Sequence, residues 1–440
     1  MSQICIVGDI LVDISLKNSN TPLKMRLGGI IHAARSLWAM NIDYCIGYFA
    51  PSYLDSHIQK YLPQIGCSKI LKLGNVQNCP YTMLIDEVKE VGDQGYEFIL
   101  RDNIKISYDE ITVKELSNYD DIFFISGNYD LSLIITNIPV SSKIHYDIAN
   151  NINDLEELKI DRKFETLFIS TSSKIFKNIC DNNMFAIESF IGLFETMTNI
   201  LLLKENRGGS RAYNFKKKKI ENIPAQTQKI VHSVGVGDVY DMVYIVLSNK
   251  YPLNEALHYS SWIATEYAKT TFPDDFKKMT LRVLYTPITE IISLGGCLLP
   301  WEQRRKCHIY IAAPDFDFVN TAPVEIVESC LLYHNFAPHR PIKENGQMPK
   351  NATWEEKQSI FEKDMILLNQ CNMLIAVLLY NDPGTLIEIG MASERKIPTI
   401  VYDPYNIASN CMLTQLPDLV SSDLDEVISE VFLFYSRLID

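Results

Sequence analysis

The sequence lacks the features of a membrane protein, of a nucleic-acid-coating protein and of a disulfide-bonded protein. None of its apolar stretches reaches the roughly 18–20 residues that a membrane-spanning helix needs. Its 41 Lys and Arg face 54 Asp and Glu, and the net charge of -13 excludes the broad basic face that binds a nucleic-acid polymer. The ten cysteines form no CxxC pair and no regular spacing, which argues against a zinc site and a disulfide framework.

The first residues, MSQICIVGDILVDI, also lack a basic segment followed by an apolar segment and a small-residue cleavage site. We therefore expect no signal peptide, reduced cysteines and a cytoplasmic protein with no membrane partner and no bound metal. These absences leave small molecules as the expected ligands, because a nucleotide needs only a few local hydrogen-bond donors.

What the sequence does contain is enough chain for two hydrophobic cores, with 440 residues of which 47% are hydrophobic. Short apolar runs alternate with amphipathic stretches, which is typical of α/β proteins with mainly parallel sheets. Two segments open alike, Ile4–Ile14 and His308–Phe318. Between them, glycines, a proline and a charged cluster break the periodicity near residues 296–306. We therefore expect two domains, residues 1–296 and residues 306–440.

The strongest pattern lies in the second domain. Residues Asn372–Leu379 read as a buried parallel strand, followed by the turn YNDPGT and a helical stretch at Leu386–Arg395. In a doubly wound sheet, ligands bind where such a strand ends and a helix begins. Glu388 falls in the first turns of that helix, where we expect the helix dipole to keep a nucleophilic carboxylate ionised.

Two residues of the turn favour the same interpretation. Gly384 permits close approach of the backbone to a substrate, and Thr385 can cap the helix or donate to a substrate hydroxyl. By itself, a glutamate such as Glu388 is more often a capping or surface residue.

Further polar residues are expected at this edge of the sheet, and together with Glu388 they indicate a reactive site. Asp364 lies in the preceding helical stretch, and Asp382 lies in the turn before Glu388. Tyr310 and Asp315 lie at the end of another predicted strand, so that we expect them to converge on the same edge. Cleavage of a glycosidic bond needs a carboxylate at the anomeric carbon and an acid or donor at the leaving group.

The segments IYIAAPDF, FAPHRP and EKDMILLNQCNMLIAVLLYNDPGTLIEIGMASERKIPTIVYD resemble nucleoside 2-deoxyribosyltransferases over about residues 307–405. The resemblance implies a smaller, flavodoxin- or Rossmann-like doubly wound parallel sheet that needs no cofactor. It implies that Glu388 attacks C1′ to form a covalent glycosyl-enzyme, that Asp364 and Asp382 hold the sugar and the base, and that Tyr310 orients the nucleophile. It assigns Asp315, Gly384 and Thr385 to the substrate, and it implies a homo-oligomer.

This segment also departs from the family. Ala313 stands where the family has the second glycine of its opening motif, and residues 344–353 form a long polar stretch. Relatives of this fold also hydrolyse nucleoside monophosphates or act on NAD-like dinucleotides. Transfer and hydrolysis are therefore both open, and the expected substrate is a nucleoside, a nucleotide or an NAD-like molecule.

In the first domain, three glycine- and aspartate-containing segments follow one another. Asp13 comes after the first strand, and Gly28-Gly29 precede a helical stretch. The third segment, Ser233–Asp238, places Gly235 and Gly237 before an apolar helix expected at about residues 239–248. Free amides at such a helix start can bind an anion, and an acid there can act as a base toward a sugar hydroxyl.

Together these three segments resemble the ribokinase-like (PfkB) sugar and nucleoside kinases over about residues 1–295. The resemblance implies a ribokinase-like α/β domain that uses ATP and Mg²⁺, in which Asp13, Gly28 and Gly29 contact the sugar. It implies that Gly235 and Gly237 bind an anion and that Asp238 is the catalytic base.

The departures in the first domain concern the kinase chemistry itself. The family's asparagine after the glycine pair is His32 here, its usual acid before the glycine turn is His232, and a helix glycine is Val243. No NxxE motif for magnesium and phosphate is recognisable, because Phe168–Ser173 holds neither Asn nor Glu. Whether this domain phosphorylates its ligand or only binds it is left open.

Three interpretations of the whole chain follow. The first is an enzyme that cleaves or exchanges an N-glycosidic bond, joined to a ribokinase-like domain that binds or phosphorylates a related sugar or nucleoside. The second is an effector that hydrolyses NAD or nucleotides, for example in phage defence, when the first domain senses a ligand. The third is a binding module made of two inactive enzyme folds, against which the spacing of Asp364, Asp382 and Glu388 counts.

Overall fold

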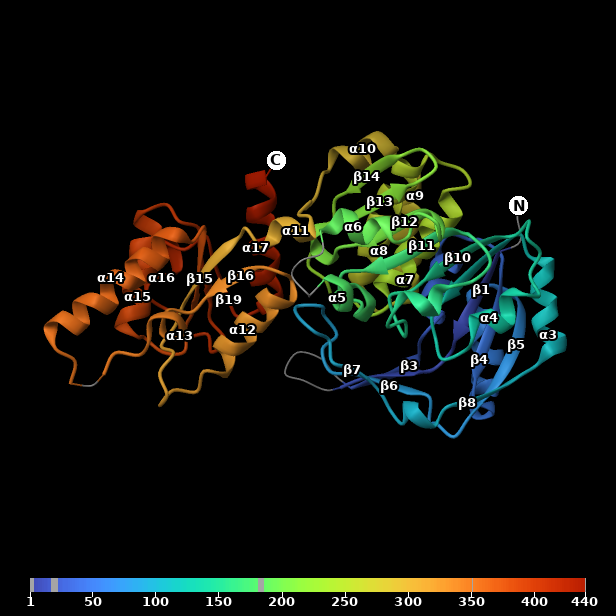
Figure 1. Ribbon diagram of the computed structural model, residues 1–440, viewed down its shortest axis with the longest axis horizontal. Helices are drawn as coiled ribbons and strands as arrows, with labels where there is room; N and C mark the ends of the chain where they lie inside the picture. Colours follow the sequence, from blue (N-terminus) through green and yellow to red (C-terminus); the bar gives the residue numbers. More distant parts are fainter. Residues whose placement is uncertain (1–3, 17–22, 181–185, 350, 440) are drawn as a thin grey trace. The chain divides into compact units, whose positions relative to one another are not determined.

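The computed structural model describes residues 4–16, 23–180, 186–349 and 351–439. Its backbone divides into two compact units (Figure 1). The first unit comprises Met1–Glu90 and Gln94–Leu298, and the second comprises Val91–Asp93 and Leu299–Asp440. No helix in the described ranges has the length and apolar character needed to cross a membrane.

The first unit is built on a ten-stranded sheet whose seven central strands are parallel. Antiparallel strands close it at both edges. In pairing order the strands are β14 (Lys219–Ile223), β13 (Ser210–Asn214), β12 (Thr198–Lys204), β11 (Phe164–Ser170), β10 (Lys143–Asp147), β9 (Asp121–Ile125), β1 (Ile4–Asp9), β4 (Tyr44–Ala50), β5 (Cys67–Gln77) and β8 (Lys105–Tyr108).

A second, four-stranded sheet in this unit carries Asp13 and the residues before Gly28. Its strands pair in the order β3 (Lys24–Leu27), β2 (Val12–Ser15), β6 (Thr82–Ile85) and β7 (Tyr96–Phe98). Because the chain passes from β3 directly into helix α1, this small sheet brings Asp13 to the start of that helix.

Helices cover the large sheet and supply its core. Helices α1 (Ile31–Ala39), α7 (Val236–Leu247) and α8 (Leu253–Ala268) bury apolar side chains against strand residues such as Ile6 and Phe123. The other helices of the unit are α2 (Asp55–Tyr61), α3 (Glu110–Lys114), α4 (Leu131–Ile135), α5 (Lys174–Cys180), α6 (Ile187–Gly192), α9 (Pro273–Tyr285) and α10 (Ile288–Ser293).

The second unit is a five-stranded, all-parallel sheet. Its pairing order is β16 (Ala337–His339), β15 (His308–Ala312), β17 (Met373–Val377), β18 (Thr399–Tyr402) and β19 (Leu419–Ser421). Numbered along the chain, this order is 2-1-3-4-5, the flavodoxin-like arrangement of a doubly wound sheet. The expected α/β class and the doubly wound second sheet are confirmed.

One face of this sheet packs against three helices, two of which carry residues of the candidate site. These are α14 (Trp354–Gln370), α15 (Pro383–Glu394) and α16 (Cys411–Gln415), whose buried residues form one core with Leu374, Ala376 and Val401 of the strands. The remaining helices of the unit are α11 (Trp301–Arg304), α12 (Ala322–Tyr333), α13 (Pro341–Asn345) and α17 (Leu424–Ile439).

Two helices begin earlier than their apolar patterns predict. Helix α15 begins at Pro383 and not at Leu386, because the Asp382 side chain caps it and proline fits the first helical position. Helix α7 begins at Val236 and not near residue 239, because Gly235 adopts a φ of 75° and turns the chain directly into the helix. Both early starts bring the candidate polar residues inside a helix.

Candidate active site

The candidate site of the second unit lies at the carboxyl ends of β15 and β17, which are neighbours in the sheet. The strand order reverses between these two strands, so the chain leaves them on opposite faces and opens a crevice. Tyr310 comes from β15, Asp364 from α14, and Glu388 from the second turn of α15. Of the residues expected to converge, Tyr310 contacts Glu388, and Asp364 and Asp382 are close enough to affect its pKa, whereas Asp315 pairs with Arg340.

The central contact is a short hydrogen bond between Tyr310 and Glu388. The Tyr310 hydroxyl donates to Glu388 Oε1 over 2.5 Å. The tyrosine is fully buried, and Glu388 is half-buried. Because β15 is buried, the hydroxyl holds one carboxylate oxygen in place, and among the described residues the other oxygen accepts no side-chain hydrogen bond.

The charge state of Glu388 differs from the one expected from the helix dipole. Its pKa is raised to about 7, mainly by burial and also by the neighbouring carboxylates Asp364 and Asp382, while the hydrogen bond from Tyr310 opposes this rise. The dipole acts mainly within the first turn, and Glu388 lies beyond that turn. A carboxyl with a pKa near 7 is partly protonated at neutral pH and gains nucleophilic strength as it ionises.

The two aspartates around Glu388 are held differently. Asp364 Oδ1 accepts a hydrogen bond of 2.8 Å from the Asn345 side chain, and burial raises its pKa. Asp382 is the N-cap of α15, and its Oδ2 accepts from the Thr385 amide at 2.8 Å and from the Thr385 hydroxyl at 3.0 Å. The Thr385 hydroxyl therefore donates to the helix cap and not to a substrate. A side chain at Gly384 would lie 3.0 Å from Asp382 Oδ2 and would crowd this cap.

Asp315 is engaged by a residue that the sequence reasoning did not single out. The guanidinium of Arg340 holds it with two bonds, Nε to Oδ2 at 2.8 Å and Nη2 to Oδ1 at 2.5 Å. Arg340 also donates to Glu328 at 2.7 Å and is 4% exposed. The carboxylate of Asp315 thus orders the loop after β15, because both of its oxygens are already occupied.

In the first unit, the expected sugar-binding residues come together around Asp13. His32 Nε2 lies 3.0 Å from Asp13 Oδ2, and His32 Nδ1 lies 2.7 Å from the Tyr267 hydroxyl. Burial lowers the pKa of His32 to about 4, so the ring is neutral and donates to the aspartate. A Cβ at Gly28 would lie 2.1 Å from the Asp13 carboxyl carbon, so only glycine fits there.

The glycines flanking this group serve the same packing. Gly29 has a φ of +63°, and a Cβ there would lie 2.1 Å from the Asp9 carbonyl oxygen. Gly235 has a φ of +75°, and a Cβ there would overlap the His32 ring. His32 thus fills the space beside Asp13, between the Gly28-Gly29 pair and Gly235.

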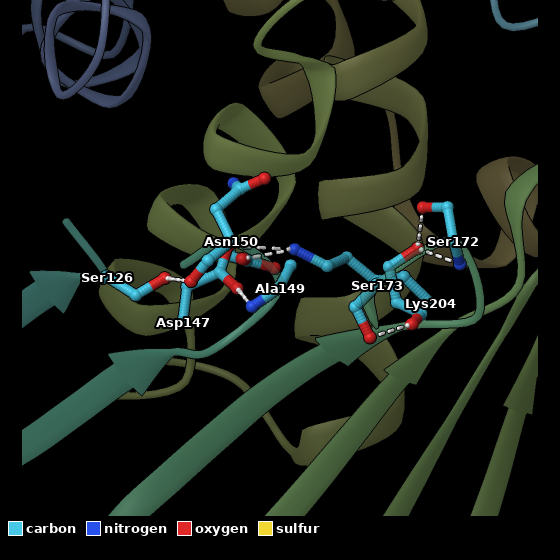
Figure 2. Close-up of polar contacts among 9 residues, drawn as sticks. Ser126, Asp147, Ala149, Asn150, Ser172, Ser173 and Lys204 are labelled. Carbon is cyan, nitrogen blue, oxygen red and sulfur yellow. Dashed lines mark hydrogen bonds and ion pairs between the residues drawn. The ribbon is translucent and has the colours of Figure 1, made fainter. Parts of the chain in front are cut away.

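At the carboxyl ends of the strands of the large sheet lies a partly buried lysine for which the sequence gives no local signal. Lys204, the last residue of β12, bonds Asp241 at 2.6 Å and Asp147 at 3.2 Å. Figure 2 shows its ammonium reaching Asp147 beside Asn150 at the carboxyl ends of the strands. A Cβ at Gly237 would lie 3.3 Å from Lys204 Nζ, so the ammonium lies against the glycine turn expected to bind an anion.

Asp238, the expected base, lies in the same electrostatic neighbourhood. Its pKa is raised to about 7, mainly by burial and also by the charges of Asp147 and Asp13, whereas Lys204 lowers it. Asp13 and Asp238 therefore influence one another, as residues that share a site do.

The residues of this edge do not fit the magnesium that a kinase requires. Asp147 and Asp241, the carboxylates nearest the turn, are already paired with the Lys204 ammonium, and Asp147 also accepts from the Ala149 amide. No group of three His, Cys, Asp or Glu side chains suited to a metal ion occurs in the part of the chain that the structure describes. We derive no phosphoryl-transfer step for this unit.

Comparison with known families finds one similarity, which lies in the second unit. Residues 309–417, 109 of the 440, match the family model of nucleoside 2-deoxyribosyltransferases. The matched segment contains Tyr310, Asp364, Asp382 and Glu388. A search of curated proteins found no match to the chain.

Solved structures similar to the chain are sugar and nucleoside kinases. Ribokinase from Giardia lamblia is 13% identical with a TM-score of 0.48, covering 67% of this chain and 100% of its own. A nucleoside kinase from Methanocaldococcus jannaschii is 14% identical with a TM-score of 0.45, covering 65% and 99%. Arabidopsis thaliana ribokinase, solved with ribose and ATP, is 12% identical with a TM-score of 0.45, covering 65% and 99%. Similarity at this level says nothing about what this chain binds.

Proposed function

We propose that the second unit cleaves or exchanges the N-glycosidic bond of a nucleoside or nucleotide, with Glu388 as nucleophile. The observation that carries this proposal is the Tyr310–Glu388 hydrogen bond, set among Asp364 and Asp382 within the segment similar to nucleoside 2-deoxyribosyltransferases. A buried tyrosine that fixes one oxygen of a half-buried carboxylate is an arrangement suited to directed attack on one atom.

The proposed reaction has two steps. Ionised Glu388 attacks C1′, a C1′–O ester forms as the C1′–N bond breaks, and the electron pair of that bond passes to the base. The departing base takes up a proton, and Asp364 is suited to donate it because burial raises its pKa. In the second step an acceptor base or a water molecule attacks C1′ and releases Glu388. Attack by an acceptor base gives transfer, and attack by water gives hydrolysis.

The role of Tyr310 makes a prediction about pH. Tyr310→Phe removes the hydrogen bond that lowers the pKa of Glu388, so this pKa rises above about 7. The nucleophile acts only when ionised, so activity is lost as pH falls through its pKa. In the variant we expect the acid limb of kcat/KM to move to higher pH, with activity at about pH 6 reduced by about tenfold.

The matched control for this experiment is Tyr405→Phe, which changes an exposed tyrosine of the same unit. Its pH profile should coincide with that of the wild type. A Tyr310→Phe profile with an unmoved acid limb would contradict the proposed coupling between the two residues.

The substrate class is tested by following base release from a panel. The full chain is incubated with deoxynucleosides, ribonucleosides, nucleoside monophosphates and NAD, each with and without a free acceptor base, and products are separated by chromatography. Glu394→Gln, an exposed glutamate on the same helix as Glu388, is the control for loss of a carboxylate. Release only with an acceptor indicates a transferase, and release in water indicates a hydrolase.

For the first unit we propose binding of a sugar or nucleoside at Asp13, Gly28 and Gly29, without phosphorylation. Binding is supported by the hydrogen bond between His32 and Asp13 beside the Gly28-Gly29 pair. The absence of phosphorylation is supported by the ion pairs of Lys204 with the carboxylates beside the Gly235–Asp238 turn. Asp13→Asn should weaken the binding of ribose or a nucleoside by about tenfold, because a carboxylate accepts stronger hydrogen bonds from hydroxyls than an amide does. Calorimetric titration of the full chain checks this, and unchanged affinity would exclude Asp13 from the site.

A further inference from the structure

A cavity of the first unit borders the residues around Asp13, because its lining residue Arg26 lies 3.7 Å from the Asp13 carboxylate. Its volume is about 290 Å³, and its wall comes from β3, α1, the end of α8 and the segment leading into α9. Three cationic side chains line it, Lys24, Arg26 and Arg35, together with Tyr267 and His232. The convergence of three cations on one cavity indicates a ligand of opposite charge.

Among the described residues, one carboxylate faces the three cations of this cavity. Within the same ranges, the hydrogen bonds of the Arg35 side chain go to neutral hydroxyls, from Nε to Tyr61 at 3.1 Å and from Nη1 to Tyr267 at 3.2 Å. Lys24 has no carboxylate partner within the described ranges. One acidic group, Asp13, lies 3.7 Å from Arg26 Nε, and it already accepts from His32.

Two more side chains of the cavity, Arg26 and His232, bear on its charge. The buried Nε of Arg26 has no hydrogen-bond partner among the described residues, which is costly for a charged donor. His232 is neutral, because burial and the charge of Arg26 lower its pKa to about 4, and its Nε2 bonds the Thr270 carbonyl. An anion with several oxygens would satisfy Arg26 and Arg35 together.

The mouth of the cavity is apolar. Phe272 is 69% exposed and Met25 is 66% exposed, and both line the cavity with Pro273. An exposed aromatic ring beside a cluster of cations suits a ligand with a flat apolar part joined to an anionic group.

We propose that this cavity binds a nucleoside monophosphate, with its phosphate against Lys24, Arg26 and Arg35 and its base against Phe272. The phosphate offers three oxygens to guanidinium and ammonium donors, and no metal is needed because the counter-charge comes from the protein. The site does not depend on the chemistry proposed for Glu388, so either proposal stands if the other fails.

The experiment is calorimetric titration of the full chain with AMP, adenosine, ribose 5-phosphate and inorganic phosphate. Lys24→Gln and Arg26→Gln are compared with Lys278→Gln, which removes an exposed lysine of α9 outside the cavity. We expect AMP to bind, and each cavity variant to weaken it by about tenfold or more, because a hydrogen bond to a charged group is lost. Lys278→Gln should bind as the wild type does.

The other probes separate the contributions. Ribose 5-phosphate and phosphate should bind more weakly than AMP but with the same sensitivity to Lys24→Gln, and Phe272→Ala should weaken AMP alone. Adenosine binding as tightly as AMP, AMP affinity unaffected by either cavity variant, or no binding of any phosphate compound would overturn the proposal. Rising salt should weaken AMP binding, because the attraction is between charges.

Discussion

Glu388→Gln is expected to reduce base release by at least about a thousandfold, because an amide cannot form the glycosyl ester. Glutamine has the shape of glutamate, and its side-chain oxygen can still accept the hydrogen bond from Tyr310. The fold of α15 should therefore be retained, and circular dichroism and thermal unfolding should match those of the wild type. The loss measured is then a loss of chemistry and not of structure.

Initial rates of base release, measured on the best substrate of the panel, check this prediction. Glu394→Gln provides the comparison, since it removes a carboxylate from the exposed end of the same helix. Asp364→Asn should slow the reaction less, because a water molecule can protonate many leaving bases. Glu388→Gln with more than about a tenth of wild-type activity would be incompatible with a nucleophilic role.

Lys204→Met is expected to destabilise the first unit by about 3–5 kcal/mol, because it leaves two buried carboxylates without their cation. Asp147 is 2% exposed and Asp241 is fully buried, and both are bonded to Lys204. Methionine fills a similar volume, so the cost comes from charge and not from a cavity. Burial also raises the pKa of Asp241, so a carboxyl without its lysine is readily protonated in acid.

The loss of unfolding free energy in Lys204→Met should depend on pH. As pH falls, Asp241 takes up a proton in the variant, its buried charge disappears, and the difference in unfolding free energy from the wild type shrinks. Scanning calorimetry of the full chain at neutral and mildly acidic pH measures it. Lys250→Met, at an exposed position of the same unit, should leave the transition unchanged. A Lys204→Met transition within about 1 kcal/mol of wild type would show that the pairs contribute little.

Local patterns predicted much of the second unit. The strand at Met373–Val377, the turn after it and the helix bearing Glu388 are consecutive in sequence, so periodicity and turn residues were sufficient. The start of α15 was also readable, because Asp-Pro is a signal for an N-cap followed by a first helical position. That signal outweighs the apolar pattern, which begins later at Leu386.

The contacts that set charge were not predictable from one sequence. Tyr310 and Glu388 are 78 residues apart, and the pKa of Glu388 depends on how deeply both are buried. Arg340 reaches back 25 residues to take both oxygens of Asp315. Such pairings depend on the way helices pack on the sheet, which apolar periodicity does not encode.

In the first unit, too, some features have a local signal in the sequence and others do not. The glycines at 28, 29 and 235 were expected to admit a ligand, and the close neighbours that the structure gives them are Asp13, Asp9 and His32 of the chain itself. Lys204 gave no local sign of its importance, since a lysine at the end of a strand is usually solvated. Its burial depends on Asp147 and Asp241 from two other elements.

The most direct test of the proposed nucleophile is capture of its covalent intermediate. The wild-type chain, mixed with its best substrate and no acceptor, is quenched in acid within the first turnover and analysed by intact mass and peptide mapping. The account predicts one sugar residue esterified to the peptide that contains Glu388, and none in Glu388→Gln. A sugar attached to another residue, or base release with inversion at C1′ and no covalent adduct, would contradict it.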